Sequence, residues 1–427
     1  MKNRLADDPN ERDNMRTAAE KLEEAVGLAA AIDLEIVHSL IAPIATLRPA
    51  TLFGTGKVDE IAGIVAAMDA GLVIVDHTLT PIQQRNLEKA WNTKVLDRTG
   101  LILEIFGRRA ATKEGTLQVE LAHLNYQRGR LVRSWTHLER QRGGAGFLGG
   151  PGETQIEADR RILRDKIKSL ENELEQVRRT RSLHRAKRKK VPLPIVAFVG
   201  YTNAGKSTLF NRITGADVVA KDMLFATLDP TLRRIKLPGG TQTVLSDTVG
   251  FVSDLPTHLV AAFRATLEEV READIIVHVH DVSHSQTGAQ ANDVEMVMSD
   301  LGISGERADA VVNVWNKIDL LPEDAHSAIN ARAEREPDAI ALSAVTGEGI
   351  SDFLALIEER ISGTLVARRI AVPPSRFSDV AWLYENAIVD DRRVDEDGTI
   401  IVEVRVTQDT DELLASQLPE SSIIKLN

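Results

Sequence analysis

Short apolar runs alternate with amphipathic stretches in the first quarter of the chain. Apolar residues that recur every three to four positions predict helices over 18–32, 57–70 and 81–91, and short apolar runs predict strands over 34–41, 72–76 and 94–96. Strands that alternate with helices are typical of α/β units, so residues 15–111 are expected to form a small α/β domain. Residues 1–14 are polar and charged, and we expect a disordered tail there.

Two short motifs in this region are interpreted as helix starts. Gly54-Thr-Gly-Lys57 resembles part of a phosphate loop. Such a loop needs glycine where Thr51 stands and Ser or Thr where Val58 stands, so a helix that begins after Gly54 is favoured. The motif Asp97-Arg-Thr99 predicts another helix, with Thr99 as a candidate N-cap.

Between residues 112 and 190 the apolar positions follow a heptad-like spacing. They are Leu117, Leu121, Leu124 and Leu131 in a first stretch, and Ile156, Leu163, Ile167, Leu170, Leu174 and Val177 in a second. Two such helices predict an antiparallel hairpin, whose second helix would be about 50 Å long. Its tip, residues 141–153, is glycine-rich. A flexible linker is one interpretation of this tip and close contact with a ligand or RNA is another, which Phe147 and Leu148 favour.

From residue 191 to residue 365, strand patterns recur between helical ones. The strands are predicted over 195–199, 232–237, 243–246, 275–280, 310–316 and 339–342. Pro238-Gly-Gly240 predicts an antiparallel hairpin of the second and third strands, and the remaining pattern predicts a doubly wound, mostly parallel sheet. Residues 366–427 predict a small α+β domain, with strands over 370–372, 387–391 and 399–406 and helices over 378–385 and from Asp411.

The first strand of this sheet leads into a phosphate-loop motif. Gly200-Tyr201-Thr202-Asn203-Ala204-Gly205-Lys206-Ser207-Thr208 fits G-x-x-x-x-G-K-[ST] between a strand and a helix. Backbone N–H groups of such a loop point at phosphate oxygens, Lys206 would reach the β- and γ-phosphates, and Ser207 would ligate Mg²⁺. A chance match is the alternative, and the flanking strand and helix disfavour it.

Two downstream motifs complete a candidate centre for Mg²⁺ and the γ-phosphate. In Asp247-Thr248-Val249-Gly250, Asp247 would hold Mg²⁺ through water and the Gly250 amide would meet the γ-phosphate. In Phe225-Ala226-Thr227-Leu228-Asp229, Thr227 would ligate Mg²⁺ only when the γ-phosphate is bound, which predicts a switch loop. Thr231 is the alternative to Thr227. The candidate catalytic residues are Lys206, Thr227 and Gly250.

The ends of the last two strands carry residues suited to guanine. They are Asn316-Lys317-Ile318-Asp319 and Ser343-Ala344-Val345. A buried Asp319 carboxylate would accept hydrogen bonds from guanine N1–H and the N2 amine, and the Ala344 N–H would meet O6. Adenine lacks the N2 amine and would leave the carboxylate unpaired, so the motifs predict a GTP-binding domain.

Phe251 stands where many GTPases place a glutamine that orients the attacking water. A phenyl ring cannot position water. We therefore expect slow intrinsic GTP hydrolysis that a partner stimulates.

Composition and charge indicate where the protein is located and which class of partner it binds. The 427 residues contain no cysteine, the charged start does not fit a signal peptide, and no apolar run could span a membrane, so a cytoplasmic protein is expected. The net charge is −11, yet residues 108–190 hold 21 Lys and Arg against 10 Asp and Glu. Such a basic segment indicates contact with a phosphate backbone, although charge alone allows a solvated helix face equally well.

With these motifs placed, the chain resembles the HflX family, bacterial ribosome-associated GTPases of the Obg–HflX group. Within the GTPase domain the resemblance is carried by the phosphate loop, by the 225–229 and 247–251 motifs and by Leu255-Pro256. Outside that domain it is carried by Leu96-Asp-Arg-Thr-Gly100, Gln118-Val-Glu-Leu121, Trp135-Thr-His-Leu-Glu-Arg140 and Gly150-Pro-Gly-Glu-Thr-Gln155. It implies Mg²⁺-dependent GTP hydrolysis, binding to the large ribosomal subunit and its rRNA in the GTP state, and GTP-dependent splitting of stalled or idle ribosomes. It also implies that the hairpin tip approaches the peptidyl-transferase centre. The family pattern favours Thr227 over Thr231 as the Mg²⁺ ligand of the switch loop, and a hydrophobic residue at position 251 is typical of the group.

Two other functions stay open at this point. One is a regulatory GTPase that acts on a protein effector, with the basic hairpin merely solvated. The other is a nucleotide-dependent RNA-remodelling enzyme driven by ATP, which Asn316 and Asp319 disfavour. A monomer is expected in each case.

Overall fold

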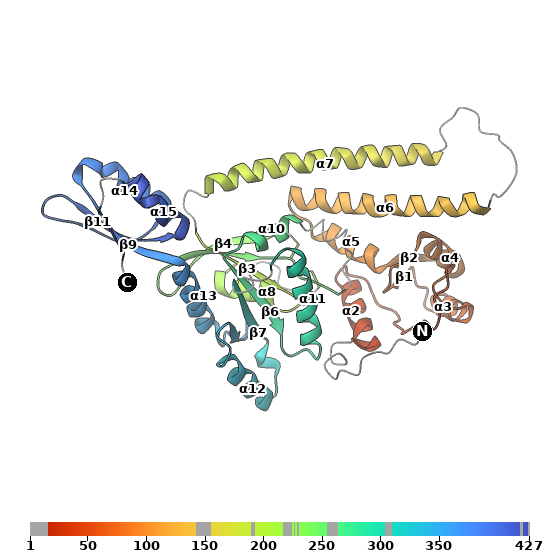
Figure 1. Ribbon diagram of the computed structural model, residues 1–427. Coiled ribbons are helices and arrows are strands. Elements are labelled where there is room, and N and C mark those ends of the chain that lie inside the picture. Colours follow the sequence, from red (N-terminus) through yellow and green to blue (C-terminus); the bar gives the residue numbers. More distant parts are fainter. Residues whose placement is uncertain are drawn as a thin grey trace, which may run out of the picture.

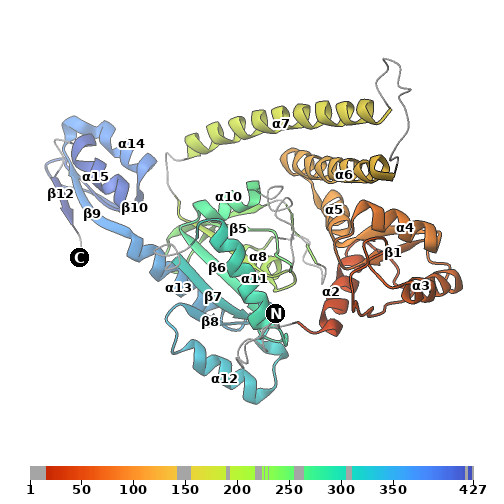
Figure 2. The ribbon, with the colours of Figure 1, turned by 45° about the vertical axis from the view of Figure 1, so that its right-hand side comes forward.

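A computed structural model describes residues 16–141, 155–188, 193–216, 224–225, 227–228, 230–253, 264–303, 310–418 and 422–425. Its three sheets have two, six and four strands, in chain order, and a long helical hairpin runs past the first two (Figures 1 and 2). Within the described residues, no helix has the length and apolar character needed to cross a membrane. The predicted tail, 1–14, and the hairpin tip after Gln141 lie outside these residues.

The N-terminal part is a two-stranded parallel sheet with helices packed against it. Its elements are α2 (Ala18–Ala30), α3 (Thr55–Ala67), β1 (Leu72–Val75), α4 (Pro81–Trp91), β2 (Lys94–Asp97) and α5 (Arg98–Arg109). Leu87, Trp91 and Val95 lie in its apolar core. The predicted helices over 18–32, 57–70 and 81–91 and the strands over 72–76 and 94–96 are confirmed. Gly54 is the N-cap of α3, as expected.

Two expectations for this part are wrong. Residues 34–41 form neither strand nor helix, and Ile36 and Val37 are 40% and 49% exposed. Among the described strands β1 pairs only with β2, so this segment lacks the neighbour that would make its apolar pattern a strand. The N-cap of α5 is Asp97 and not Thr99, because the Asp97 side chain accepts from Gly100 N at 2.8 Å.

The predicted hairpin is present as α6 (Lys113–Gln141) and α7 (Gln155–Arg188). The apolar positions of the heptad-like pattern meet in one cluster made of Leu117, Leu124, Ile167, Leu170 and Leu174, with Leu121, Leu163 and Val177 packed against it. Both views show α6 and α7 running side by side (Figures 1 and 2). The seam therefore holds the two helices together, while another face of α6 packs on the N-terminal part through Val119, Ala122 and Tyr126.

The central sheet has strand order β4-β5-β3-β6-β7-β8. Its strands are β3 (Ile195–Gly200), β4 (Thr231–Lys236), β5 (Gln242–Asp247), β6 (Ile275–Asp281), β7 (Val311–Asn316) and β8 (Ala339–Ala341). Only the β4–β5 pair is antiparallel, as predicted. The helices are α8 (Lys206–Thr214), α10 (Arg264–Glu272), α11 (Thr287–Asp300), α12 (Glu323–Ala333) and α13 (Ile350–Thr364), with the 3₁₀ turn η3 (Ile318–Leu320) after β7.

Alternate residues of β3 enter two apolar clusters on opposite faces of this sheet. Val196 and Phe198 belong to one cluster, and Ala197 and Val199 to the other. A strand buried on both faces is typical of a doubly wound sheet. The second cluster continues into the N-terminal part, where Leu28, Ile102 and Phe106 join it. The Phe106 ring meets that of Phe225 edge-on, with centroids 4.8 Å apart. The two parts therefore share a core.

The C-terminal part is an antiparallel sheet of order β10-β11-β9-β12 with two helices. Its elements are β9 (Leu365–Val372), η4 (Pro374–Arg376), α14 (Phe377–Asn386), β10 (Ile388–Val394), β11 (Ile400–Thr407), α15 (Gln408–Gln417) and β12 (Ser422–Lys425). The sequence pattern missed β12. Arg405 Nη1 donates to Thr241 Oγ1 at 2.6 Å, so this part contacts the turn between β4 and β5.

Asp97 gives a test of the junction between α5, β2 and α6. Its side chain is fully buried and accepts from Tyr126 Oη, Arg130 Nη2 at 2.7 Å and two backbone N–H groups. Asp97→Ala would leave the Arg130 guanidinium without this carboxylate, so we expect denaturant unfolding to show a loss of about 3–5 kcal/mol.

The matched control is Asp33→Ala. Asp33 pairs with Arg108 on the surface, where an ion pair contributes about 0–1 kcal/mol. Equal losses in the two variants would contradict a structural role for Asp97.

Candidate nucleotide-binding site

The loop from Gly200 to Gly205 depends on its two glycines. Gly200 has φ +151°, and a Cβ there would lie 2.3 Å from the Val279 carbonyl oxygen. Gly205 has φ +96°, and a Cβ there would lie 2.1 Å from Asn316 Nδ2. The loop can therefore lie against β6 and Asn316 only with glycine at both positions, and α8 begins directly after it.

Lys206 is the first residue of α8 and is 6% exposed. Its Nζ donates to the carbonyl oxygens of Gly200 at 3.1 Å and Tyr201 at 2.8 Å. Burial lowers the pKa of Lys206 to about 8, although the nearby Asp247 carboxylate opposes the shift. The ammonium thus lies beneath the loop, in the position from which a lysine can reach a bound phosphate.

Three predicted Mg²⁺ residues meet at one point. Ser207 Oγ donates to Asp247 Oδ2 at 2.7 Å, Thr227 Oγ1 donates to the same oxygen at 2.8 Å, and the two hydroxyl oxygens are 2.9 Å apart. Asp247 Oδ1 is buried and has no hydrogen-bond partner within the described residues. Burial raises the pKa of Asp247 even though Ser207 and Lys206 favour its charged form. Hydroxyl and carboxylate oxygens are the ligands that Mg²⁺ prefers, so this cluster fits the ion.

The segment after β5 lies directly on the phosphate loop. Thr202 N donates to Phe251 O at 2.7 Å and Phe251 N donates to Gly200 O at 3.1 Å, which makes an isolated parallel bridge. A Cβ on Gly250 would lie 2.8 Å from Thr202 Cγ2 and 3.0 Å from Lys206 Nζ. The Phe251 side chain is 3% exposed and belongs to the core shared with the N-terminal part, so the ring does not face solvent.

At the other end of the site, Asn316 joins two loops. Its Nδ2 donates to Ala204 O at 2.8 Å, and its Oδ1 accepts from Ala344 N at 3.0 Å. Lys317, with φ 68°, forms an ion pair with Asp281 at 2.7 Å. Asp319 is exposed on η3, while its neighbour Ile318 takes the buried position of that turn.

The other candidate residues surround these contacts. Buried ones are Tyr201, Thr202, Ala204, Phe225, Leu228, Thr248, Val249 and Ser343, partly exposed ones are Ser207 and Thr208, and the exposed ones are Asn203 and Val345. Ala226 and Asp229 lie outside the described residues. The phosphate end, the Mg²⁺ cluster and the Asn316 junction therefore occupy one continuous edge of the sheet, at the carboxyl ends of β3, β5 and β7.

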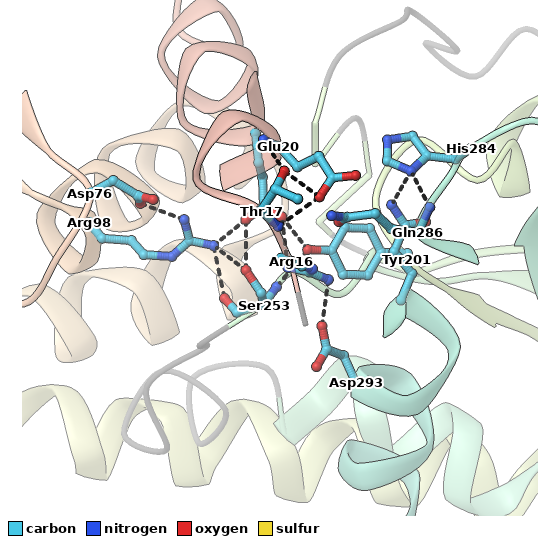
Figure 3. A network of polar contacts seen from close by, with 12 residues as sticks. Arg16, Thr17, Glu20, Asp76, Arg98, Tyr201, Ser253, His284, Gln286 and Asp293 are labelled. Atoms are coloured by element: carbon cyan, nitrogen blue, oxygen red, sulfur yellow. Dashed lines mark hydrogen bonds and ion pairs between the residues drawn. The ribbon is translucent and has the colours of Figure 1, made fainter. Parts of the chain in front are cut away.

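One group of contacts beside the loop could not be predicted from the sequence. Tyr201 donates its hydroxyl to Glu24 of α2. Arg98 of α5 donates to Ser253, two residues beyond Phe251 (Figure 3). Arg98 was part of a motif that was interpreted as a helix start and that also carries the family resemblance, but neither interpretation gave it a contact with this loop. No periodicity or spacing links residues 24, 98, 201 and 253, because they come from four separate elements.

Family models match nearly the whole chain. They are described as "GTP-binding GTPase N-terminal" over residues 19–107, "GTP-binding GTPase Middle Region" over 109–188, "50S ribosome-binding GTPase" over 195–317 and "HflX C-terminal domain" over 328–423.

Curated relatives agree with these matches. A protein named GTPase HflX from Magnetococcus marinus is 48% identical over 387 residues, which cover 90% of this chain and 88% of the relative. The GTPase HflX of Escherichia coli is 45% identical over 387 residues, which cover 91% of this chain and 90% of the relative.

Among solved structures, a GTP-binding protein from Sulfolobus solfataricus in complex with GDP is 22% identical to this chain. The match covers 81% of this chain and 96% of that chain, with a TM-score of 0.45.

Asn316 generates a test of the site's architecture. Asn316→Ala would leave the Ala204 carbonyl and the Ala344 N–H, both buried, without their partner, so we expect the free energy of unfolding to fall by about 2–4 kcal/mol. Chemical denaturation followed by far-UV circular dichroism measures the change.

Asn330→Ala on α12 is the matched control. Its amide makes only a 3.5 Å contact with His326, so the expected change is within about 0.5 kcal/mol. If Asn316→Ala were no more costly than this control, the proposed junction between the two loops would be wrong.

Proposed function

The chain belongs to the HflX family of GTPases, and from that premise we propose that it is a GTP-driven factor that binds the large ribosomal subunit and splits stalled or idle ribosomes. The observation that carries the proposal is the match of residues 195–317 to a ribosome-binding GTPase, combined with the basic hairpin of α6 and α7 that precedes them. The hairpin offers the surface for RNA, and the central sheet offers the nucleotide site that governs binding.

In this proposal the loop from Gly200 to Ser207 holds the phosphates of GTP through its backbone N–H groups and Lys206. Ser207, Thr227 and, through water, Asp247 would hold Mg²⁺, which supplies charge neutralisation at the β- and γ-phosphates. The unpartnered Asp247 Oδ1 supports this assignment. Gly250 offers its amide to the γ-phosphate.

The base would lie against the Asn316-to-Asp319 turn and the Ser343-to-Val345 loop. The exposed Asp319 carboxylate is free to turn towards guanine N1–H and N2, and Asn316 keeps the two base loops at a fixed spacing. Discrimination against adenine then rests on the hydrogen bonds that Asp319 makes only with guanine.

Slow intrinsic hydrolysis follows from Phe251. Its ring is packed in the core and can neither orient nor polarise a water molecule. The residues that bind and orient GTP are thus all supplied by this chain, while the group that positions the attacking water has to come from the partner or from a rearrangement on it.

The outer face of α7 is the part of the hairpin best suited to RNA. Arg164 and Lys168 are exposed on it, whereas Ile167 and Leu170 are buried in the seam. A cation on a helix face that packing leaves open can approach a phosphate backbone without disturbing the hairpin. The helix spans 34 residues, about 50 Å, long enough to reach into a large particle.

Sucrose-gradient analysis of ribosomes with the full-length protein tests the splitting proposal. We expect free subunits to increase with GTP and with a non-hydrolysable GTP analogue, but not with GDP, because only a triphosphate brings Thr227 and Gly250 to the same anion. Failure to associate with ribosomes in any nucleotide state would defeat the ribosomal proposal, and association without subunit release would defeat splitting.

The same gradients with hairpin variants separate RNA contact from contact with a protein effector. Arg164→Ala with Lys168→Ala should weaken association and reduce the slope of log affinity against log salt by about one per residue removed. Asp165→Ala with Glu171→Ala on the same helix is the matched control and should not weaken association. Equal effects of the two pairs would favour a solvated hairpin.

The pKa of Lys206 predicts how nucleotide affinity depends on pH. A bound phosphate favours the charged ammonium, whereas burial brings the pKa of the free group to about 8. GDP affinity should therefore be constant below about pH 8 and fall above it, towards about tenfold per pH unit. Calorimetric titrations between about pH 7 and pH 9 measure the profile.

Lys206→Arg is the control, because arginine keeps its charge across this range. Its affinity for GDP should not vary over the same pH interval, even if it is weaker throughout. A flat profile for the unmodified protein, or an identical fall in the Arg variant, would show that Lys206 does not carry the charge.

A further inference from the structure

One of the two loops assigned to the guanine base, residues 343–349, is joined to the central sheet by a short edge strand. That strand, β8, has three residues and lies at the end of the strand order (Figure 2). The loop closes on itself, because Gly347 N donates to Ser343 O at 2.9 Å and Ser343 N donates to Glu348 O at 3.0 Å. These bonds give the loop its shape but do not set its position relative to the phosphate loop.

A first contact with the phosphate side comes from Asn316, whose amide joins the Ala204 carbonyl to the Ala344 N–H. This contact holds the 343–349 loop at one residue, so the rest of the loop could still rotate about it. Val345, the next residue, is 67% exposed, and its side chain is therefore not held by packing. The orientation of the loop needs a second contact.

Arg212 of α8 makes that second contact. Its Nη2 donates to Thr346 O at 3.0 Å, and its Nη1 donates to Val345 O at 3.4 Å. The guanidinium also lies against the backbone of Gly347, since a Cβ there would be 2.5 Å from Arg212 Nη2. Gly347 has φ +93°, so glycine permits both the left-handed backbone and the close approach of the guanidinium.

The helix α8 therefore contacts both ends of the nucleotide site. Lys206 and Ser207 stand at its start, and Arg212 follows Lys206 by six residues, about 9 Å along the helix. A loop bound to this helix keeps a fixed distance from the phosphate end. The Ala344 N–H needs that precision, because it already donates to Asn316 Oδ1 at 3.0 Å and can serve a base oxygen only as a three-centre hydrogen bond.

We propose that Arg212 is a positioning residue for guanine recognition, which holds the 343–349 loop where the Ala344 N–H meets the O6 oxygen of the base. Arg212 acts through two carbonyl oxygens of the loop and does not touch the nucleotide. The inference rests on the proposed GTP site and deepens it, because it assigns recognition of the 6-oxo group to a contact between α8 and this loop. Recognition of the N2 amine stays with Asp319.

Competition against a GDP that carries a fluorescent label on its ribose tests the proposal, using the full chain with Mg²⁺. The competitors are GDP, inosine diphosphate, ADP and pyrophosphate. In Arg212→Ala, the affinities for GDP and inosine diphosphate should fall alike, by about five- to tenfold, because both bases carry O6. The affinities for ADP and pyrophosphate should stay within about twofold, since neither offers an oxygen to the Ala344 N–H.

Arg212→Lys provides a second variant at the same position. A lysine ammonium can reach one carbonyl oxygen but lacks the planar fork that serves two, so its losses for GDP and inosine diphosphate should lie between those of the unmodified protein and Arg212→Ala. Arg212 is exposed, so neither substitution leaves a cavity in the core.

Arg332→Ala is the matched control. Arg332 is also an arginine beside the base end, where its guanidinium lies 4.5 Å from the centroid of the Trp315 ring and pairs with Glu336 at 2.9 Å. In the part of the chain that the structure describes, it forms no hydrogen bond with the 343–349 loop. Its affinities for all four competitors should equal those of the unmodified protein.

Several results would overturn the proposal. They are an unchanged GDP affinity in Arg212→Ala, an equal loss in Arg332→Ala, a loss for GDP without one for inosine diphosphate, and an equal loss for ADP or pyrophosphate, which would mean that α8 itself was disturbed. If the unmodified protein bound GDP no more tightly than ADP, the proposed GTP site would fail first. If it preferred GDP and Arg212→Ala kept that preference in full, this inference alone would fail.

Discussion

A carboxylate largely enclosed between two parts of a protein has to be paired, and the pairing of Glu24 shapes this structure. Two guanidinium groups and two hydroxyl groups surround it, and they come from the chain before α2, from α5, from the phosphate loop and from the segment after Phe251. Removing one partner of such a buried group costs about 3–5 kcal/mol, so the four segments are constrained to meet. The apolar core that Phe106 and Phe225 share lies beside this network and fixes the same interface.

The contacts continue from Glu24 through Arg98 to the hairpin. Arg98 follows Asp97, which is fully buried and accepts from Tyr126 and Arg130 of α6. The helical hairpin and the segment that follows Phe251 are thus joined by two adjacent residues at the start of α5. On the opposite side, Arg405 of the C-terminal part holds the turn between β4 and β5 through Thr241. The nucleotide site is therefore bounded by contacts from both flanking parts.

The sequence sufficed for features that depend on local chemistry. The phosphate loop, the order of strands and helices and the heptad-like seam were predictable, because each is encoded by neighbouring residues or by a short period. The strand predicted over residues 34–41 was wrong, because an apolar pattern becomes a strand only beside another strand. The sequence did not indicate which residue of the 3₁₀ turn η3 would be buried: it is Ile318, and Asp319 is exposed. The contacts of Glu24 with Arg98, Tyr201 and Ser253 could not be predicted, because these residues meet only after the two parts have packed.

Amide hydrogen exchange at Thr202 and Phe251 tests most directly whether the loop and the segment after β5 are closed against one another until a γ-phosphate separates them. In this structure their N–H groups bond to Phe251 O and Gly200 O across the gap. We expect both amides to be protected with GDP and the Phe251 amide to lose protection when a non-hydrolysable GTP analogue is bound, with further loss of the GDP-state protection in Glu24→Gln. Equal protection of Phe251 with both nucleotides would contradict it.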